Sequence, residues 1–184
     1  IKFILSLFIT TPTIFSDEYI YIKMSQSFFQ NLDFRVHEIP TLNYPPLYPI
    51  LLSITYLTKN VGYAYILMKM LNALMTSLVI IPSYLITKEF LDQKKALVTS
   101  VIISLMPMFF VFPGFIMSEN LFYTLFLTSL YFIYKSFTEK NYKYDVFAGI
   151  FIGLSFLTRF AGIALVVIVI IILIYKSTIV LVYR

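Results

Sequence analysis

Residues 61–87 read VGYAYILMKMLNALMTSLVIIPSYLIT, and Lys69 is the only charged residue among them. A helix needs about 20 consecutive, mostly apolar residues to cross the hydrocarbon core of a bilayer. This stretch exceeds that requirement, and its low charge is typical of a transmembrane helix. We therefore predict that residues 61–87 span a membrane.

Further apolar runs are predicted to be additional spans. They cover residues 1–15, 96–112, 119–134, 145–158 and 162–175. Arg159 separates the last two. A single helix over residues 145–175 would rise about 46 Å, whereas the hydrocarbon core is about 30 Å thick. We expect two short helices with a turn near residues 158–162, and one tilted helix is the alternative.

The composition of the whole chain also indicates a membrane protein. Its 184 residues are 60% hydrophobic and 12% charged, with a mean hydropathy of +0.88, whereas soluble domains are about 25% charged. The predicted fold class is an all-α, polytopic transmembrane helical bundle, with residues 1–184 as a single transmembrane domain. The absence of Cys excludes disulfides and thiolate metal sites. Lys and Arg are scattered, so we expect a bilayer as partner and no nucleic acid.

The N-terminal third is predicted to hold a clipped helix and a long outer loop. The chain starts at Ile1, so we expect residues 1–15 to be a truncated first helix, with a signal-peptide core as the alternative. Residues 16–60 are too polar to span. Within this loop, apolar residues at helical spacing predict short interfacial helices over residues 19–29 and 47–57.

Loop charge predicts the orientation of the bundle, because cytoplasmic loops are enriched in Lys and Arg. The short basic loops at residues 88–95 and 135–143 should be cytoplasmic. The long first loop, the turn at residues 113–118 and the turn at Arg159 then share the outer face. We expect a multi-pass integral membrane protein, located in the plasma membrane if it is prokaryotic.

Several charged side chains would lie at this outer boundary. Asp17 and Glu18 follow the first apolar run, where adjacent acids either end a helix in solvent or serve as a catalytic base or metal ligands. Glu119 opens the span that Ser118 is predicted to cap, where the helix dipole favours an acid without any catalytic role. Arg159 interrupts an apolar run, so it either snorkels to the interface or faces a partner, a cavity or a phosphate.

Two more residues are weaker candidates. Lys69 lies about two turns into its span and is also expected to face a partner or a phosphate. His37 is the single His, and with Asp17 and Glu18 it makes a weak candidate set for a divalent metal. A lone loop His is more often an ordinary surface residue, so no cofactor is certain.

The order of these features carries a family resemblance. The motifs are Asp17-Glu18-Tyr19, Tyr44-Pro45-Pro46-Leu47-Tyr48-Pro49, Lys69 with Asn72, Ser118-Glu119-Asn120-Leu121-Phe122 and Gly153-Leu154-Ser155-Phe156-Leu157-Thr158-Arg159. The set resembles the GT-C superfamily of polyprenyl-phosphate-dependent glycosyltransferases. It is most similar to glycosyltransferase family 39, the protein O-mannosyltransferases, and to their prokaryotic relatives, which include lipid A aminoarabinose transferases. The similarity covers almost the whole chain.

The resemblance implies a role for each matching charge. Asp17, with Glu18 beside it, corresponds to the acidic pair whose Asp lies closest to the chemistry, and it would be the general base. Lys69, where relatives usually have Arg, and Arg159 correspond to basic residues that would stabilise the donor phosphate. Glu119 corresponds to the acid that opens the fourth span at the substrate site.

One position departs from the aminoarabinose transferases. Those enzymes have an acid and a Lys just before the proline that matches Pro46, whereas this chain has Tyr44 and Pro45. A metal or phosphate role of that pair therefore does not transfer, which argues against aminoarabinose as the sugar. Tyr44 would instead help to shape the wall of the substrate cleft.

The implied function is transfer of a hexose, mannose-like, from a polyprenyl-phosphate donor to a hydroxyl of a protein, lipid or glycan, with inversion, on the outer or lumenal face. The second half of the family fold is missing, so this fragment is expected to be inactive alone. A transporter or lipid flippase is one alternative, and it predicts polar groups and broken helices near the midplane. A non-catalytic membrane subunit is the other.

Overall fold

The computed structural model describes the chain except residues 10–14, 38, 42, 140 and 183–184, and it describes side chains up to Tyr175. The described chain is mostly helical, as predicted. Its α-helices are α1 (Lys2–Ser6), α2 (Ser16–Asn31), α3 (Leu47–Ser53), α4 (Val61–Ser77), α5 (Ile80–Thr87), α6 (Gln93–Ser104), α7 (Pro107–Val111), α8 (Glu119–Thr138), α9 (Tyr142–Thr158) and α10 (Ile163–Val182). Short 3-10 helices are η1 (Ile54–Leu57), η2 (Phe112–Gly114) and η3 (Phe160–Gly162). An antiparallel hairpin of β1 (Arg35–Val36) and β2 (Ile39–Pro40) follows α2.

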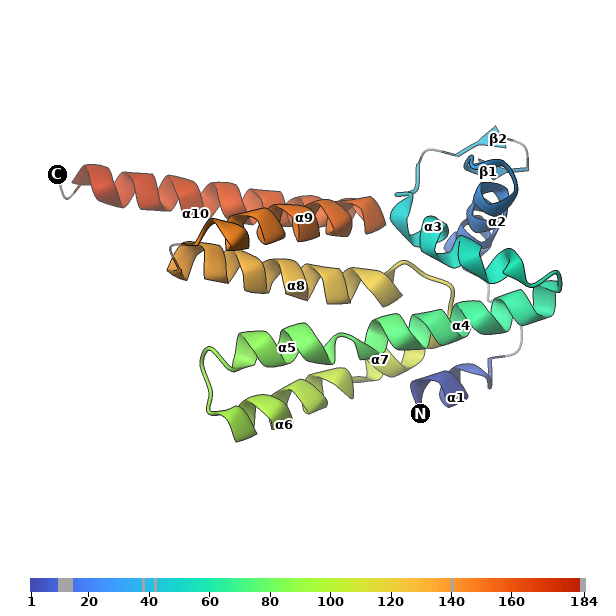
Figure 1. Ribbon diagram of the computed structural model, residues 1–184, viewed down its shortest axis with the longest axis horizontal. Coiled ribbons are helices and arrows are strands. Elements are labelled where there is room, and N and C mark those ends of the chain that lie inside the picture. Colours follow the sequence, from blue (N-terminus) through green and yellow to red (C-terminus); the bar gives the residue numbers. More distant parts are fainter. Residues whose placement is uncertain (10–14, 38, 42, 140, 183–184) are drawn as a thin grey trace.

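The long helices lie roughly along one axis (Figure 1). Helices α8, α9 and α10 pack on one another, α4 and α5 pack against α8, and α6 packs against α5. Helices α2 and α3 gather where α4 and α8 begin and where α9 meets α10; we call this the α2–α3 end. The turns from α5 to α6 and from α8 to α9 lie at the opposite end, which we call the α5–α6 end.

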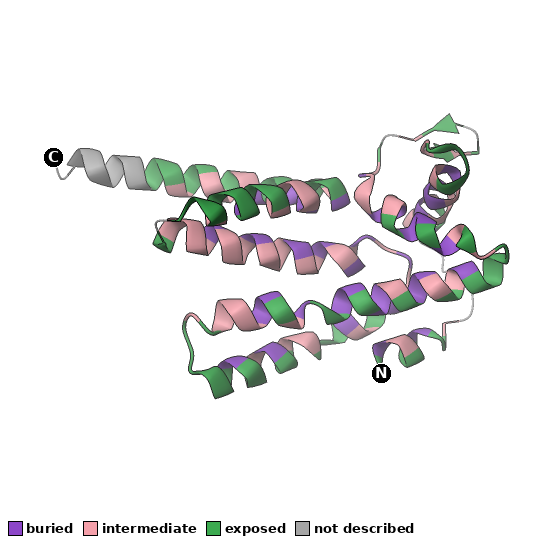
Figure 2. Ribbon diagram, viewed as in Figure 1, coloured by how far each residue is buried: buried purple, intermediate pink, exposed green. Residues whose placement is uncertain are grey.

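Buried side chains form two clusters between the helices. The larger one lies at the α2–α3 end and consists of Tyr21, Tyr48, Leu52, Met68, Met75 and Ile116. The smaller one joins α8, α9 and α10 through Ile133, Ala148 and Leu165. Figure 2 shows exposed residues along α6 and α10, and many of these are large and apolar. Contiguous apolar surface is typical of a face covered by a partner or by lipid.

The helix over Val61–Thr87, which joins α4 and α5, is long and apolar enough to cross a membrane. Residues Gln93–Ser104 and Pro107–Gly114 pass the same test only together, and they are bent by 57° at their junction. Shorter apolar helices cover Leu47–Leu57 and Phe160–Tyr175. Within the described residues the 61–87 span is thus the clearest, and the bundle of six spans stays a prediction.

Two prolines break helices that the sequence analysis treats as continuous. Pro82 has no N–H for the carbonyl of Leu78, so the helix is interrupted there and resumes as α5. Pro107 restricts Met106 to an extended conformation, with φ −60° and ψ 144°, which ends α6. The predicted 96–112 span is therefore two helices with a bend between them.

The α2–α3 end also differs in detail from expectation. Helix α2 covers Ser16–Asn31, longer than the predicted 19–29, so Asp17 and Glu18 lie in its first turn. Of the predicted 1–15 helix, the structure describes only Lys2–Ser6 as helical. Ser118 does precede α8, but its side chain makes no capping hydrogen bond.

The junction of α9 and α10 lies where the turn near residues 158–162 was predicted. Helix α9 ends at Thr158, and Arg159 is extended, with φ −149° and ψ 138°. Gly162 is buried in η3 beside the end of α9, and a Cβ at this position would lie 2.6 Å from the backbone nitrogen of Phe156. Only Gly lets the chain turn this tightly against α9.

Candidate functional site

Asp17 lies in the first turn of α2, facing the loop that leads to α3. Its side chain is half-buried, and its Oδ1 accepts a hydrogen bond of 2.8 Å from the Tyr44 hydroxyl. Burial, and then the hydrogen bond to Asp17, raise the pKa of Tyr44 to about 12. The phenol is therefore a constant donor at neutral pH, and it fixes the orientation of the carboxylate.

Glu18 is the next residue but has a different environment. Its side chain is 0% exposed, and Oε1 accepts hydrogen bonds from the Tyr65 hydroxyl at 3.0 Å and from the Ile116 amide at 3.1 Å. These contacts tie α2 to α4 and to the segment before α8. Glu18 thus holds the end of the bundle together, and of the two acids only Asp17 is open to a ligand.

Arg159 and Glu119 form an ion pair between the end of α9 and the start of α8. The Arg159 side chain is 36% exposed and that of Glu119 is 13% exposed. Arg159 also lies 6.0 Å from the centre of the Phe122 ring. Glu119 Oε2 is buried and has no partner within the described residues. The pair leaves a partly exposed guanidinium at the α2–α3 end, and guanidinium groups bind phosphate oxygens well.

Tyr21 lies between Asp17 and the Arg159–Glu119 ion pair in the network of contacts. Its hydroxyl donates to Ser118 Oγ at 2.9 Å, directly before Glu119, and its ring makes an edge contact with Tyr44 at 5.4 Å. Burial raises the pKa of Tyr21, and the charges of Arg159, Glu119 and Asp17 also act on its phenol. Tyr21 therefore links the Asp17–Tyr44 hydrogen bond to the segment that carries Glu119.

Sequence reasoning did not single out Tyr21. A signal was present, because Tyr21 is four residues after Asp17 and so lies on the same face of α2. The contact to Ser118, across 97 positions of sequence, could not be read from local spacing.

A buried amide network supports the turn before α8. The Tyr48 hydroxyl donates to Asn72 Oδ1 at 2.8 Å, and Asn72 Nδ2 donates to the carbonyl of Phe115 at 2.9 Å. Asn120 Nδ2 donates to the same carbonyl at 3.0 Å. Tyr48, Asn72 and Asn120 stand in the quoted motifs, and their hydrogen bonds fix the turn that carries Glu119.

Lys69 makes its described contacts with the N-terminal segment and with Tyr65, not with Asp17 or Arg159. Its side chain is 2% exposed, and its Nζ donates to the carbonyls of Ser6, at 3.1 Å, and of Ile9. The ammonium also lies 4.6 Å from the centre of the Tyr65 ring. These contacts hold the N-terminal segment on α4. A phosphate-binding role for Lys69 stays a prediction, and the described contacts give the side chain a structural one.

His37 belongs to the exposed hairpin turn. Its ring stacks on Tyr19 and its Nε2 lies 3.0 Å from the Tyr19 hydroxyl. In the part of the chain that the structure describes, no three His, Asp or Glu side chains converge as metal ligands. The suggested metal set of Asp17, Glu18 and His37 is thus not assembled among the described residues.

The family model of dolichyl-phosphate-mannose-protein mannosyltransferases matches residues 43–182. This range includes Tyr44, Lys69, Glu119 and Arg159, and it starts after Asp17. Neither the curated proteins nor the solved structures include a match to the chain.

Proposed function

The chain belongs to the dolichyl-phosphate-mannose-protein mannosyltransferase family, and from this premise we propose that it transfers a mannose-like hexose from a polyprenyl-phosphate donor to an acceptor hydroxyl. The protein would lie in the membrane as a multi-pass bundle, with the α2–α3 end at the outer or lumenal face. The acceptor would be a protein, lipid or glycan. One observation carries the proposal: Tyr21 contacts Tyr44, which donates to Asp17, and donates to Ser118, which directly precedes the Glu119 that pairs with Arg159.

The proposed reaction is a single displacement. The acceptor oxygen attacks the anomeric carbon and forms the new glycosidic bond while the bond from that carbon to the phosphate oxygen breaks. The phosphate leaves with the electron pair, and the acceptor proton passes to a base. Attack opposite the leaving group inverts the configuration of the anomeric carbon.

Asp17 is suited to receive the proton. It is the half-buried acid of its pair, and the Tyr44 hydrogen bond occupies Oδ1, so Oδ2 remains for an acceptor hydroxyl. A base must reach the proton that it removes, usually over 2.6–3.2 Å. Glu18 cannot serve in this way, because its side chain is fully buried and bonded to Tyr65 and Ile116.

Arg159 is suited to stabilise the leaving phosphate. Its pair with Glu119 fixes the guanidinium through one nitrogen, Nη1, and the partly exposed remainder keeps further donors. The negative charge that develops on the phosphate oxygens would be met by a cation already in place, which requires little reorganisation. Glu119 is then a positioning residue, and Phe122 packs beneath the guanidinium.

Substitution of Asp17 in the full-length protein tests this mechanism. Purified enzyme is incubated with a panel of labelled polyprenyl-phosphate hexoses and acceptor-containing membranes, and the label transferred is measured. General-base catalysis contributes about 100- to 10,000-fold, so Asp17→Asn should lower the rate at least about 100-fold. Binding of the donor should remain, because Asn is isosteric and still accepts from Tyr44.

Asp33→Asn is the matched control. Asp33 lies in the same outer segment and pairs with Arg35 on the exposed hairpin, so this variant should keep the wild-type rate. Wild-type activity of Asp17→Asn would remove Asp17 from the mechanism. A folded wild-type protein that turned over none of the donors would contradict the transferase proposal as a whole.

A further inference from the structure

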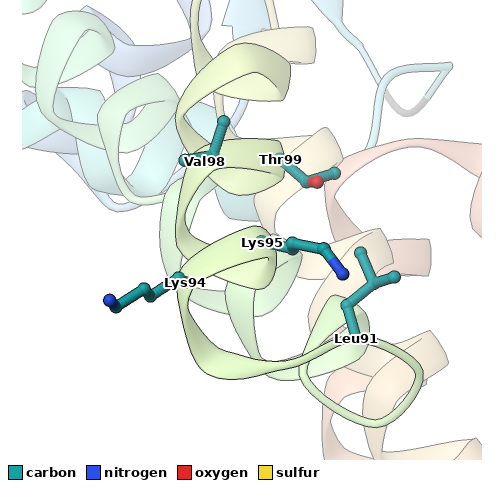
Figure 3. Close-up of a pocket in the computed structure, with 5 residues that line it drawn as sticks. All are labelled: Leu91, Lys94, Lys95, Val98 and Thr99. Carbon is teal, nitrogen blue, oxygen red and sulfur yellow. The ribbon is translucent and has the colours of Figure 1, made fainter.

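A pocket of about 350 Å³ lies beside the first turns of α6 (Figure 3). The start of α6 belongs to the α5–α6 end, opposite the start of α2 and the end of α9 (Figure 1). Lys94 and Val98 form one ridge of α6, and Lys95 and Thr99 form the next, since residues four apart share a helix face. The pocket is a shallow hollow along these ridges, and Leu91 lines it from the preceding turn. Figure 3 shows Lys95 extending toward Leu91.

The charge of this pocket is positive and weakly compensated. Lys94 forms no ion pair within the described residues. Lys95 contacts Asp92 at 3.3 Å, but the two side chains are 75% and 57% exposed, and exposed pairs of this kind are worth little. The other acid of the turn, Glu89, is already paired with Lys135 at 2.8 Å. An anion that entered the pocket would therefore meet the ammonium group of Lys95, while Lys94 extends to the other side of α6 and adds to the positive charge of the surface.

Apolar side chains surround the same lysines. Phe90, Leu97 and Val98 are 68%, 54% and 58% exposed, and Leu91 is 39% exposed. A small, soluble anion would leave this apolar surface in water. A ligand with a negative head and an apolar chain would cover both parts. Basic side chains at the cytoplasmic ends of membrane helices attract anionic lipids in this manner.

We propose that this pocket binds an anionic phospholipid. Its phosphate would lie at the ammonium group of Lys95, with Lys94 strengthening the local positive potential, and an acyl chain would run along Leu91 and Val98. This inference rests on insertion in a membrane with the α5–α6 end at the cytoplasmic surface, as the basic loops predict. It does not depend on the transferase chemistry, because Asp17 and Arg159 lie at the other end.

Lipid titration of the full-length protein tests the proposal. Detergent-purified protein is titrated with phosphatidylglycerol or with phosphatidylcholine, and bound lipids are counted by native mass spectrometry. The wild type should bind phosphatidylglycerol more tightly. Each lysine near an anionic surface contributes about fivefold to association, so Lys94→Gln/Lys95→Gln should weaken phosphatidylglycerol binding by at least about tenfold. Phosphatidylcholine binding should not change.

Two further variants separate a site from general charge. Lys94→Arg/Lys95→Arg keeps both cations and should retain the preference for phosphatidylglycerol. Lys23→Gln/Lys59→Gln removes the same charge from the α2–α3 end and should also retain it. The proposal would be overturned by any of three results. The control could lose as much affinity for phosphatidylglycerol as the Lys94→Gln/Lys95→Gln variant, that variant could keep the wild-type affinity, or the wild type could bind the two lipids equally. Wild-type transferase activity would not bear on this result.

Discussion

The α2–α3 end and the α5–α6 end hold their charged groups in different ways. At the α2–α3 end, Glu18 is fully buried and is held by hydroxyl and amide donors from two other segments. At the α5–α6 end, Lys135 lies between Glu89, at 2.8 Å, and Glu139, at 2.7 Å, whose carboxylate side chains are 24% and 44% exposed. The α2–α3 end thus holds a fully buried acid by neutral donors, and the α5–α6 end holds a lysine by ion pairs with partly exposed acids.

This difference indicates which end can support chemistry. Buried hydrogen-bonded groups keep fixed positions, because losing a partner leaves a donor or acceptor unsatisfied. Exposed ion pairs are screened by water and salt and contribute little to stability. A reaction that needs a base and a phosphate ligand at set positions therefore fits the α2–α3 end. Substitutions at both ends test this difference.

Removal of Arg159 should have the largest effect. Loss of one preorganised charge-stabilising group typically lowers a rate by about 100- to 1,000-fold. We expect Arg159→Met to lower the rate of hexose transfer in this range. The double variant Arg159→Met/Glu119→Gln removes the unpaired acid as well, and it should recover stability without recovering activity. Recovery of activity in the double variant would show that Arg159 serves only to neutralise Glu119.

A matched pair of acid substitutions compares the two ends directly. Glu18→Ala leaves the Tyr65 hydroxyl and the Ile116 amide without an acceptor, and it should cost about 3 kcal/mol of stability. Glu89→Ala, at the other end, should cost much less, because Lys135 keeps Glu139 as partner. Thermal unfolding of the detergent-solubilised variants measures both. Equal losses would mean that the ends do not differ in the way described.

Tyr44→Phe should have an intermediate effect with a pH signature. Loss of its hydrogen bond to Asp17 should lower activity severalfold and cost about 1 kcal/mol. The pKa of Tyr44 is about 12 in the folded protein and 10.0 ordinarily. Its contribution is therefore complete below pH 10 and is lost as pH rises toward 12. Unfolding midpoints from pH 8 to 12 should fall less steeply in the variant, and parallel curves would contradict this assignment.

Lys135→Gln should have the smallest effect. We expect the thermal midpoint to change by less than about 2 °C, because both acids that pair with Lys135 are partly exposed to solvent. The pKa of Glu139 is lowered, first by its hydrogen bond to Lys135, so whatever stability the pair gives is lost as pH falls below about 4.5. A midpoint measured at pH 7 and at pH 4 checks this. A large loss at pH 7 would place essential geometry at this end too.

Much of the helical layout could be predicted from the runs of apolar residues and from the charged, Gly and Pro residues that interrupt them. The 61–87 stretch is helical apart from a short break, and the chain turns at Arg159, because a charged residue and Gly162 interrupt an apolar run. The bend at Pro107 was missed, although the residue before a proline disfavours the helical conformation. The hairpin of β1 and β2 was also missed, since four residues carry too little pattern.

The site could be predicted only in outline. The sequence indicated that Asp17, Glu119 and Arg159 belong to one end, since loop charge assigns all three to one face. It could not indicate that Glu18 points into the core while Asp17 does not, because adjacent helical residues differ only by rotation about the axis. The role of Tyr21 depends on a contact with Ser118 that forms only after the bundle closes.

The missing side chain at Gly162 has a consequence for how this chain can vary. Any other residue would push into the backbone of α9 at Phe156, and the displaced turn would carry Arg159 with it. Gly162, which has no side chain, would thus control the position of the Arg159 cation three residues before it. A saturation library across residues 155–170 should therefore accept many apolar replacements in α10 but almost none at Gly162. Tolerance to mutation would thus locate the junction of α9 and α10 without a substrate assay.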